Sequence, residues 1–219
     1  AATGNIDSAI LIDVADVNGD GLDDFFIGNA ASEAGQLWIQ DKRGRFNKVE
    51  QEALYIDRFN EDTDAIFFDA NGDGYPDLLV TSGDGKNSGK HNTLIDRLYI
   101  NNGNGNFKRS KGLPATFSNS ATVSHADFDN DGDQDLFIGG ASVPGIYGYD
   151  PISFLLQNDG NGQFKDVTDK VAPELRYVGM VTDSEWYDFD LDGDMDLALV
   201  GEWMPITIFS NVLDEVEKL

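Results

Sequence analysis

The stretch from Asp127 to Asp135 reads D-F-D-N-D-G-D-Q-D and runs directly into a short apolar segment. Asp127, Asp129, Asp131 and Asp135 stand at positions 1, 3, 5 and 9, and alternate side chains on a tightly turning chain point toward one centre. Gly132 at position 6 allows the sharp turn and brings the carbonyl of Asp133, at position 7, inward. Such an all-oxygen ligand set suits Ca2+, which takes about six to eight ligands, better than Mg2+, which requires a tight octahedron. The stretch therefore predicts a calcium-binding loop.

The same nine-residue pattern occurs four times in the chain. It reads D-V-N-G-D-G-L-D-D from Asp16, D-A-N-G-D-G-Y-P-D from Asp69 and D-F-D-L-D-G-D-M-D from Asp188, always with glycine at position 6. The first positions are 53, 58 and 61 residues apart, so each loop belongs to a longer repeating unit. We expect up to four Ca2+ ions, held by the residues at positions 1, 3, 5, 7 and 9, with position 7 acting through its carbonyl: Asp16, Asn18, Asp20, Leu22 and Asp24; Asp69, Asn71, Asp73, Tyr75 and Asp77; Asp127, Asp129, Asp131, Asp133 and Asp135; and Asp188, Asp190, Asp192, Asp194 and Asp196.

An EF-hand is the main alternative for loops of this composition. It requires a helix on each side and a bidentate glutamate at position 12. Position 12 is instead aliphatic in all four loops, where it is Ile27, Val80, Ile138 and Leu199. Each loop is followed by a short run of aromatic, β-branched and aliphatic residues, which is typical of a strand. The pattern therefore indicates strand-loop-strand sites.

Composition limits the classes of protein that the chain can represent. Its 219 residues are 40% hydrophobic and 11% aromatic, which argues against disorder. A net charge of −25 would repel a phosphate backbone, so we expect no nucleic-acid partner. The chain has no cysteine, hence no disulfide and no zinc thiolate site. No signal peptide and no apolar run of membrane-spanning length is visible, so we expect no membrane insertion and a mature form or a cut fragment.

The segments around each loop predict four meanders of short antiparallel strands. In the first three units one strand precedes the loop and a second follows it, and a glycine hairpin such as N-N-G-N-G-N-F, from Asn101 to Phe107, joins the third to the fourth. The units span approximately residues 5–59, 60–115, 116–176 and 177–219 of a single domain or segment, 1–219. No fourth strand is recognisable in the last unit, which we expect to be incomplete.

The strand after each loop carries three or four consecutive apolar residues and no alternation, which indicates burial on both faces. Four-stranded meanders that stack face to face around an axis form a β-propeller, whose blades usually number about four to eight. The predicted fold class is therefore all-β, a β-propeller with calcium loops between the first and second strands, A and B, of each blade. The four predicted blades form either a complete ring or part of one.

With these motifs in place, the chain resembles the FG-GAP or VCBS repeat proteins, including the integrin α-subunit head. The segments L-Q-N-D-G-N-G-Q-F-K-D-V-T at 156–168, M-V-T-D at 180–183 and G-E-W-M-P at 201–205 resemble bacterial secreted VCBS repeat proteins more narrowly. The resemblance implies calcium loops between strands A and B, and roles in adhesion, sugar binding or support of an enzyme. Propellers of this family usually have more blades than four. We therefore expect either a piece of a longer protein or self-association through open blade edges.

Recognition is expected on the rim opposite the calcium loops. In a meander, the connections between strands B and C and from strand D to the next blade lie there. Two B–C connections are long, at 81–96 and 139–153, and the second carries Tyr147, Tyr149 and Asp150. Variable loops on a rigid scaffold are common binding sites, so a glycan or protein ligand is expected; the alternative for each loop is a solvated insertion.

Other candidate residues give weaker signals. We expect His91 to be exposed and His125 to be structural. We expect the tryptophans to pack in the core or between blades, with stacking against a sugar as the alternative: Trp38, Trp186 and Trp203. Three carboxylates offer an acid–base pair without any spacing that requires one: Asp183, Glu185 and Glu202. The sequence shows no catalytic constellation, so we expect a protein that is not an enzyme.

These observations predict a secreted or cell-surface module for adhesion or recognition, in which calcium is structural. Loops of extracellular modules bind Ca2+ with dissociation constants of roughly 10^-4 to 10^-3 M, which favours an extracellular location. The alternatives are a calcium-dependent enzyme of the polysaccharide-lyase type and a structural spacer without a ligand.

Overall fold

The computed structural model describes residues 11–84, 91–143, 145–146, 148–212 and 215–218, and its fold is all-β. The strands form four antiparallel sheets of four strands each, and every sheet keeps its strands in chain order. We call these sheets blades one to four. The prediction of four-stranded meanders that make up a β-propeller fold is thereby confirmed.

Each blade begins with the strand that leads into one acidic loop. Blade one contains β1 (Leu11–Ala15), β2 (Asp24–Gly28), β3 (Gln36–Gln40) and β4 (Phe46–Val49), and blade two contains β5 (Glu61–Phe68), β6 (Asp77–Gly83), β7 (Arg97–Asn101) and β8 (Phe107–Arg109). Blade three contains β9 (Asn119–Ala126), β10 (Asp135–Ser142), β11 (Phe154–Asn158) and β12 (Phe164–Asp166), and blade four contains β13 (Met180–Tyr187), β14 (Asp196–Glu202), β15 (Thr207–Val212) and β16 (Glu215–Lys218). The helices are short and lie in connections: α1 (Glu52–Ile56), η1 (Asn92–Leu94), α2 (Thr168–Val171) and η2 (Pro173–Leu175).

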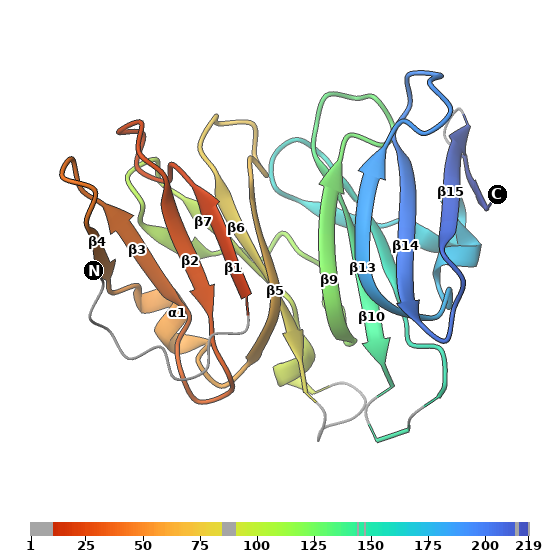
Figure 1. The fold of residues 1–219 in the computed structure, drawn as a ribbon, viewed down its shortest axis with the longest axis horizontal. Helices are drawn as coiled ribbons and strands as arrows, with labels where there is room; N and C mark the ends of the chain where they lie inside the picture. The colour runs from red at the N-terminus through yellow and green to blue at the C-terminus, as the bar shows by residue number, and fades with distance from the viewer. Residues whose placement is uncertain (1–10, 85–90, 144, 147, 213–214, 219) are drawn as a thin grey trace.

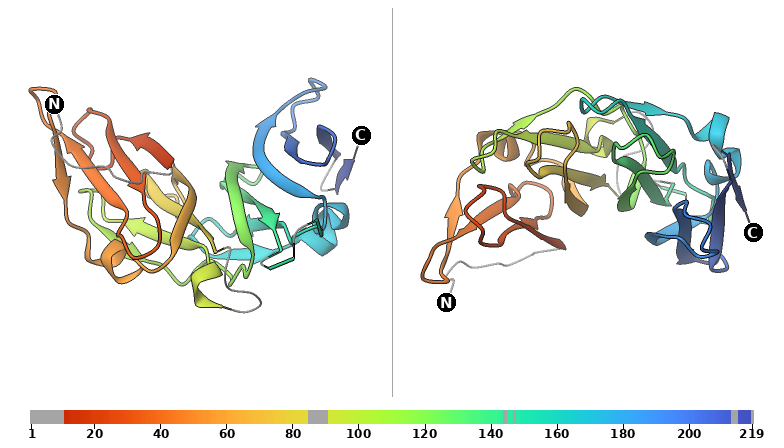
Figure 2. Two further views of the ribbon diagram at one scale, coloured as in Figure 1. Left: turned by 60° about the horizontal axis from the view of Figure 1, so that its bottom comes forward. Right: turned by 90° about the horizontal axis from the view of Figure 1, so that it is seen from above.

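The blades stand side by side along an arc, as Figures 1 and 2 show. The first strands line its inner side, because β1 contacts β5, β5 contacts β9 and β9 contacts β13. Blade one and blade four lie at opposite ends, so the described chain forms part of a ring and does not close it.

The hydrophobic core lies between successive blades. Every residue of β6 is buried, as are the first six residues of β10, which confirms that strand B is covered on both faces. One cluster of buried side chains lies at each of the three junctions between blades. Trp38 and Trp186 are buried, but Trp203 is 79% exposed in the turn between β14 and β15. The prediction of a packed Trp203 was therefore wrong, because this residue has φ +57° and stands outside the sheet.

Blade four corrects a second expectation. We expected the last unit to be incomplete, yet β16 pairs with β15 and gives this blade its fourth strand. The segment Glu215–Lys218 reads E-V-E-K and has one apolar residue, so it carries almost no strand signal. Its conformation comes from backbone pairing with the neighbouring strand, which a pattern of apolar residues does not report.

Candidate metal centres

The four acidic loops lie along one rim of the arc, where strand A of each blade turns into strand B (Figure 1). In every loop the aspartate at position 1 turns inward and accepts hydrogen bonds from the amides of positions 5 and 6. In the first loop Asp16 accepts from Gly19 at 2.8 Å, from Asp20 at 3.1 Å and from Gly21 at 2.7 Å. The loop backbone therefore wraps around one carboxylate.

Two loop positions require left-handed backbone. Position 6 is always glycine with positive φ, for example +97° at Gly132, as the turn argument predicts. Position 4 is also left-handed, and here the third and fourth loops have Asn130, at +58°, and Leu191, at +64°. This conformation destabilises a residue with a Cβ by roughly 1–2 kcal/mol of free energy, so the backbone at Leu191 is strained. The sequence analysis did not identify it.

The aspartate at position 9 is fully buried in all four loops. In the third loop Asp135 accepts the amide of Phe128 at 3.2 Å, and it also accepts the amide of Asn158, which ends strand C, at 2.7 Å. The same two bonds recur in the other loops. Burial raises the pKa of Asp77 to about 6 and that of Asp135 to about 7, although the backbone amides partly oppose this effect. Position 9 therefore joins its loop to strand C.

Three carboxylates converge in each of the last two loops. The side chains at positions 1, 3 and 9 offer oxygens that lie within 4.8 Å of one another: Asp127, Asp129 and Asp135, and Asp188, Asp190 and Asp196. In the first two loops position 3 is an asparagine, and Asn71 donates to Asp73 at 3.0 Å. The aspartates at position 5 stay exposed in all four loops and accept the amide of position 7.

Asp129 supplies the clearest sign that the third loop accommodates a cation. Its Oδ2 accepts the Nε2 of Gln157 at 2.5 Å. Its Oδ1 is buried and has no hydrogen-bond partner among the described residues. A buried carboxylate oxygen without a partner is costly, and a hard cation is the natural partner for an all-oxygen site. The residues of this loop therefore fit a calcium ion.

In blades two to four, an asparagine at or next to the end of strand C links the loop to that of the preceding blade. Asn158 Nδ2 donates to the carbonyl of Gln134 in its own loop at 3.1 Å and to that of Ala70, in the loop of blade two, at 2.9 Å. Asn101 and Asn211 bond in the same way to the carbonyls of the preceding loops. The sequence analysis missed these residues, although an asparagine at the same place in three strands was a visible signal.

The opposite rim carries exposed aromatic side chains at its blade-four end. Trp203 lies beside the backbone of Gly148 in the long connection between β10 and β11, and Tyr149 of that connection is exposed. Tyr147, which we also proposed for this surface, lies outside the described residues. His91 is exposed, as expected, and its Nδ1 lies 2.6 Å from the hydroxyl oxygen of Thr93.

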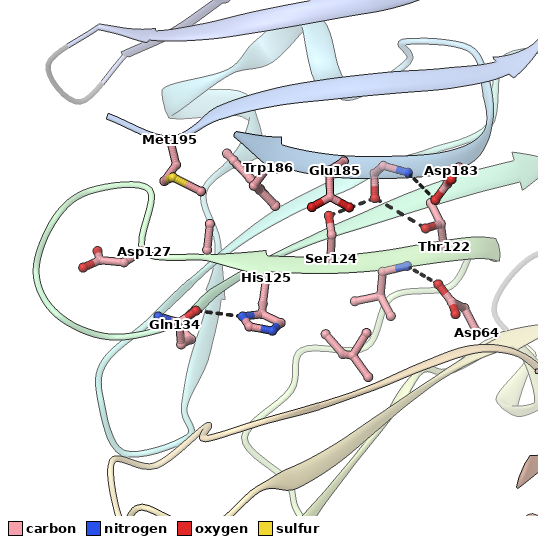
Figure 3. A pocket seen from close by; sticks show the side chains of 14 residues that line it. Asp64, Thr122, Ser124, His125, Asp127, Gln134, Asp183, Glu185, Trp186 and Met195 are labelled. Atoms are coloured by element: carbon pink, nitrogen blue, oxygen red, sulfur yellow. Dashed lines mark hydrogen bonds between the residues drawn. The ribbon is translucent and has the colours of Figure 1, made fainter. Parts of the chain in front are cut away.

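A cavity of about 690 Å3 lies on the inner side of blades two to four (Figure 3). Its walls include Asp64, Ser124, His125, Asp183, Glu185 and Trp186. His125 stacks on Phe68, with ring centroids 5.5 Å apart, and its Nδ1 lies 2.7 Å from Gln134 Oε1, in keeping with a structural role. Asp64 accepts the amide of Val123 at 2.9 Å, and burial raises the pKa of its carboxyl group. Glu202 ends β14 at the opposite rim, apart from the two carboxylates with which we grouped it.

The comparisons with known proteins agree with this architecture. The model of the FG-GAP-like repeat matches residues 16–80 and 69–138, and each match runs from one acidic loop to strand B of the next blade. The chain belongs to the FG-GAP-like repeat family. No curated protein matches it in sequence. Among the described residues, no helix is long and apolar enough to span a lipid bilayer.

A solved structure supports the same fold. The crystal structure of BBS1N in complex with ARL6DN, from a crystal soaked with lead, aligns with 96% of this chain at a TM-score of 0.53 and 13% sequence identity. The chain spans about half of that solved chain, 55% of its length. At this identity the likeness concerns the fold alone.

Proposed function

We propose that this FG-GAP-like repeat chain is an extracellular recognition module in which calcium holds the acidic loops and the opposite rim binds a ligand. The metal assignment rests on the geometry of the third loop. There, the oxygens of Asp127, Asp129 and Asp135 lie within 4.8 Å of one another, and Asp129 Oδ1 is buried without a partner among the described residues. Oxygen ligands on a loop favour Ca2+ over the softer transition metals.

The charge of each loop sets the expected order of affinity. The third and fourth loops have aspartate at positions 1, 3, 5 and 9, whereas the first two have asparagine at position 3. Because more carboxylates attract a divalent cation more strongly, the last two loops should bind first. A dissociation constant of roughly 10^-4 to 10^-3 M, as in extracellular modules, would leave the loops filled outside a cell and empty in a calcium-poor cytosol.

Calorimetric titration with Ca2+ and Mg2+ tests the metal assignment. We expect calcium-selective binding, and we expect Asp129→Asn to weaken the third site by roughly tenfold or more, in line with the loss of one charged ligand. Asp150→Asn is the control, because Asp150 is exposed on the opposite rim. Equal binding by the two variants, or no calcium binding by the unaltered chain, would contradict the assignment.

Recognition is proposed for the rim that carries Trp203 and Tyr149. An exposed indole offers a flat apolar face with a polar edge, which suits stacking against a sugar ring or a protein side chain. We expect a glycan array to give binding that Trp203→Ala abolishes. Tyr55→Ala, which removes an exposed aromatic ring at the blade-one end of the same rim, should preserve the binding. A blank array with normal calcium-dependent folding would favour a spacer, and depolymerisation of an acidic polysaccharide would favour a lyase.

A further inference from the structure

The buried aspartates at position 9 belong to a path of hydrogen bonds that runs from one blade to the next. Asp135, at position 9 of the third loop, accepts the amide of Asn158 at 2.7 Å. The Nδ2 of Asn158 donates to the carbonyl of Ala70, at position 2 of the second loop, at 2.9 Å. The amide of Ala70 in turn donates to Asp77, at position 9 of the second loop, at 3.1 Å. Position 9 of one loop is thus joined to position 9 of the loop before it.

The same connection occurs at the other two junctions between blades. The Nδ2 of Asn101 donates to the carbonyl of Val17, at position 2 of the first loop, and that of Asn211 donates to the carbonyl of Phe128, at position 2 of the third. The backbone amides of both asparagines donate to position 9 of their own loops. In each receiving loop, the amide of position 2 donates to position 9. One path therefore links all four loops, and we call its three asparagines the asparagine relay.

The relay lies out of reach of water. Its three asparagines and the three residues at position 2 that they contact are at most 4% exposed, and the aspartates at position 9 are fully buried. Hydrogen bonds in such surroundings are stronger than in water, and a buried polar group that loses its partner is costly. A displacement of position 2 in one loop would therefore leave an asparagine of the next blade without its acceptor.

Each loop has a closed arrangement, in which position 9 holds the amide of position 2. The negative charges of the loop oppose this arrangement, since the three carboxylates of the third loop, and likewise of the fourth, have oxygens within 4.8 Å of one another. A divalent cation favours it by offsetting their repulsion. Because the relay bonds to position 2 of one loop and to position 9 of the next, closing one loop lowers the free energy needed to close its neighbour.

We propose that neighbouring acidic loops bind Ca2+ with positive cooperativity, which the asparagine relay transmits. The inference rests on the calcium assignment of the proposed function. The third and fourth loops fill first because they have more carboxylates, and their closure raises the affinity of the second loop and then of the first. Direct repulsion between two bound divalent cations would give negative cooperativity instead, so the sign of the effect distinguishes the two mechanisms.

Every loop contains its own reporter of occupancy. The amide of the glycine at position 6 donates to the aspartate at position 1, which is a proposed ligand, so filling a loop should shift the amide resonance of that glycine. A calcium titration of the intact chain, followed by amide proton–nitrogen NMR, then gives a separate midpoint for each loop. The four reporters are Gly21, Gly74, Gly132 and Gly193.

Asp129→Asn tests whether the third loop affects the second. Asparagine already stands at this position in the first two loops, so the change removes a charged ligand from a loop pattern that accepts asparagine. We expect the midpoint of Gly74, in the unaltered second loop, to move to about fivefold higher calcium, at the lower end of the usual range for coupled sites. Gly21 lies one blade further along the relay and should move less.

Asp159→Asn is the control for the change of charge. Asp159 is exposed in the turn between β11 and β12 and is not a proposed ligand. The carbonyl of the next residue, Gly160, lies against Gly72 of the second loop, so this variant removes a charge close to that loop. The midpoint of Gly74 should stay within twofold of its original value, because the third loop keeps all its ligands.

Asn158→Ala interrupts the relay between the second and third loops. In this background, Asp129→Asn should no longer move the midpoint of Gly74, whereas a purely structural role of Asn158 would leave that effect in place. Asn101→Ala is the matched control, because it removes the same side chain one blade earlier and leaves the bond from Asn158 to Ala70 intact. With Asn101→Ala, the effect of Asp129→Asn on Gly74 should persist.

The outcomes separate the cooperativity from the calcium assignment. If no glycine at position 6 responds to calcium, the assignment fails and the cooperativity with it. If all four respond, but Asp129→Asn leaves the midpoint of Gly74 unchanged or moves it to lower calcium, the cooperativity is overturned and the assignment stands. This comparison does not require Asn158→Ala to fold. An effect that persists in a folded Asn158→Ala chain would overturn the role of the relay.

Discussion

Replacing Asn158 by alanine should reveal how strongly the loops of neighbouring blades depend on one another. The Nδ2 of Asn158 donates to the carbonyls of Ala70 and Gln134, and its Oδ1 accepts the amide of Asp159 at 2.9 Å. The residue is buried, so alanine removes all three bonds where water has little access. The loop of blade two and the loop of blade three then lose the side chain that ties them together.

The expected loss follows from these contacts. Each hydrogen bond contributes about 1 kcal/mol net, and each buried group left without a partner costs about 1–3 kcal/mol. Two carbonyls lose this partner, whereas the amide of Asp159 keeps its bond to the carbonyl of Gln163 at 3.1 Å. With some relaxation toward solvent, the free energy of unfolding should fall by about 3 kcal/mol. That is a large part of the roughly 5–15 kcal/mol that stabilises an ordinary domain.

Urea unfolding measures this change. With an m value of about 2–3 kcal/mol/M, the midpoint should fall by about 1 M. Gln40→Ala is the control, because Gln40 holds the same place at the end of β3 in blade one and its side chain makes no bond to another blade among the described residues. A loss below about 0.5 kcal/mol for Asn158→Ala, or an equal loss for both variants, would refute the reasoning.

Three further changes test other parts of the structure. Burial raises the pKa of Asp96 to about 7, so the folded state holds a proton that the unfolded state releases above about pH 4. The free energy of unfolding should therefore fall as the pH rises from 4 to 7. Urea titrations at each pH should show a smaller fall for Asp96→Asn. Gly112→Ala would place a Cβ 1.8 Å from the carbonyl oxygen of Gly162 and should destabilise the fold by more than about 2 kcal/mol, so an unchanged melting temperature would contradict the packing. Leu191→Asn should raise the free energy of unfolding by about 0.5–1 kcal/mol, because asparagine tolerates the left-handed backbone that Asn130 adopts at the equivalent place; a lower urea midpoint would count against strain.

Most features of the acidic loops could be predicted from residues close together in the sequence. The aspartates at alternate positions and the glycine at position 6 all fall within nine consecutive residues. In the structure this glycine has a positive φ, and Asp127 turns inward. The consecutive apolar residues of strand B likewise predicted its burial. Trp203 was misjudged because a tryptophan next to a strand has the same local signal whether the chain continues the sheet or turns away from it.

The chain's own order of residues determined the repeating units, the all-β class and the chemistry of the acidic loops, because each of these depends on side chains close together in sequence. Tertiary structure decided the rest. It brought the amide of Asn158 to Asp135, set Asp64 against Val123 of the next blade, and added β16 through backbone pairing. These contacts join residues that are far apart in sequence or rely on backbone groups that all residues share, so no local pattern specifies them.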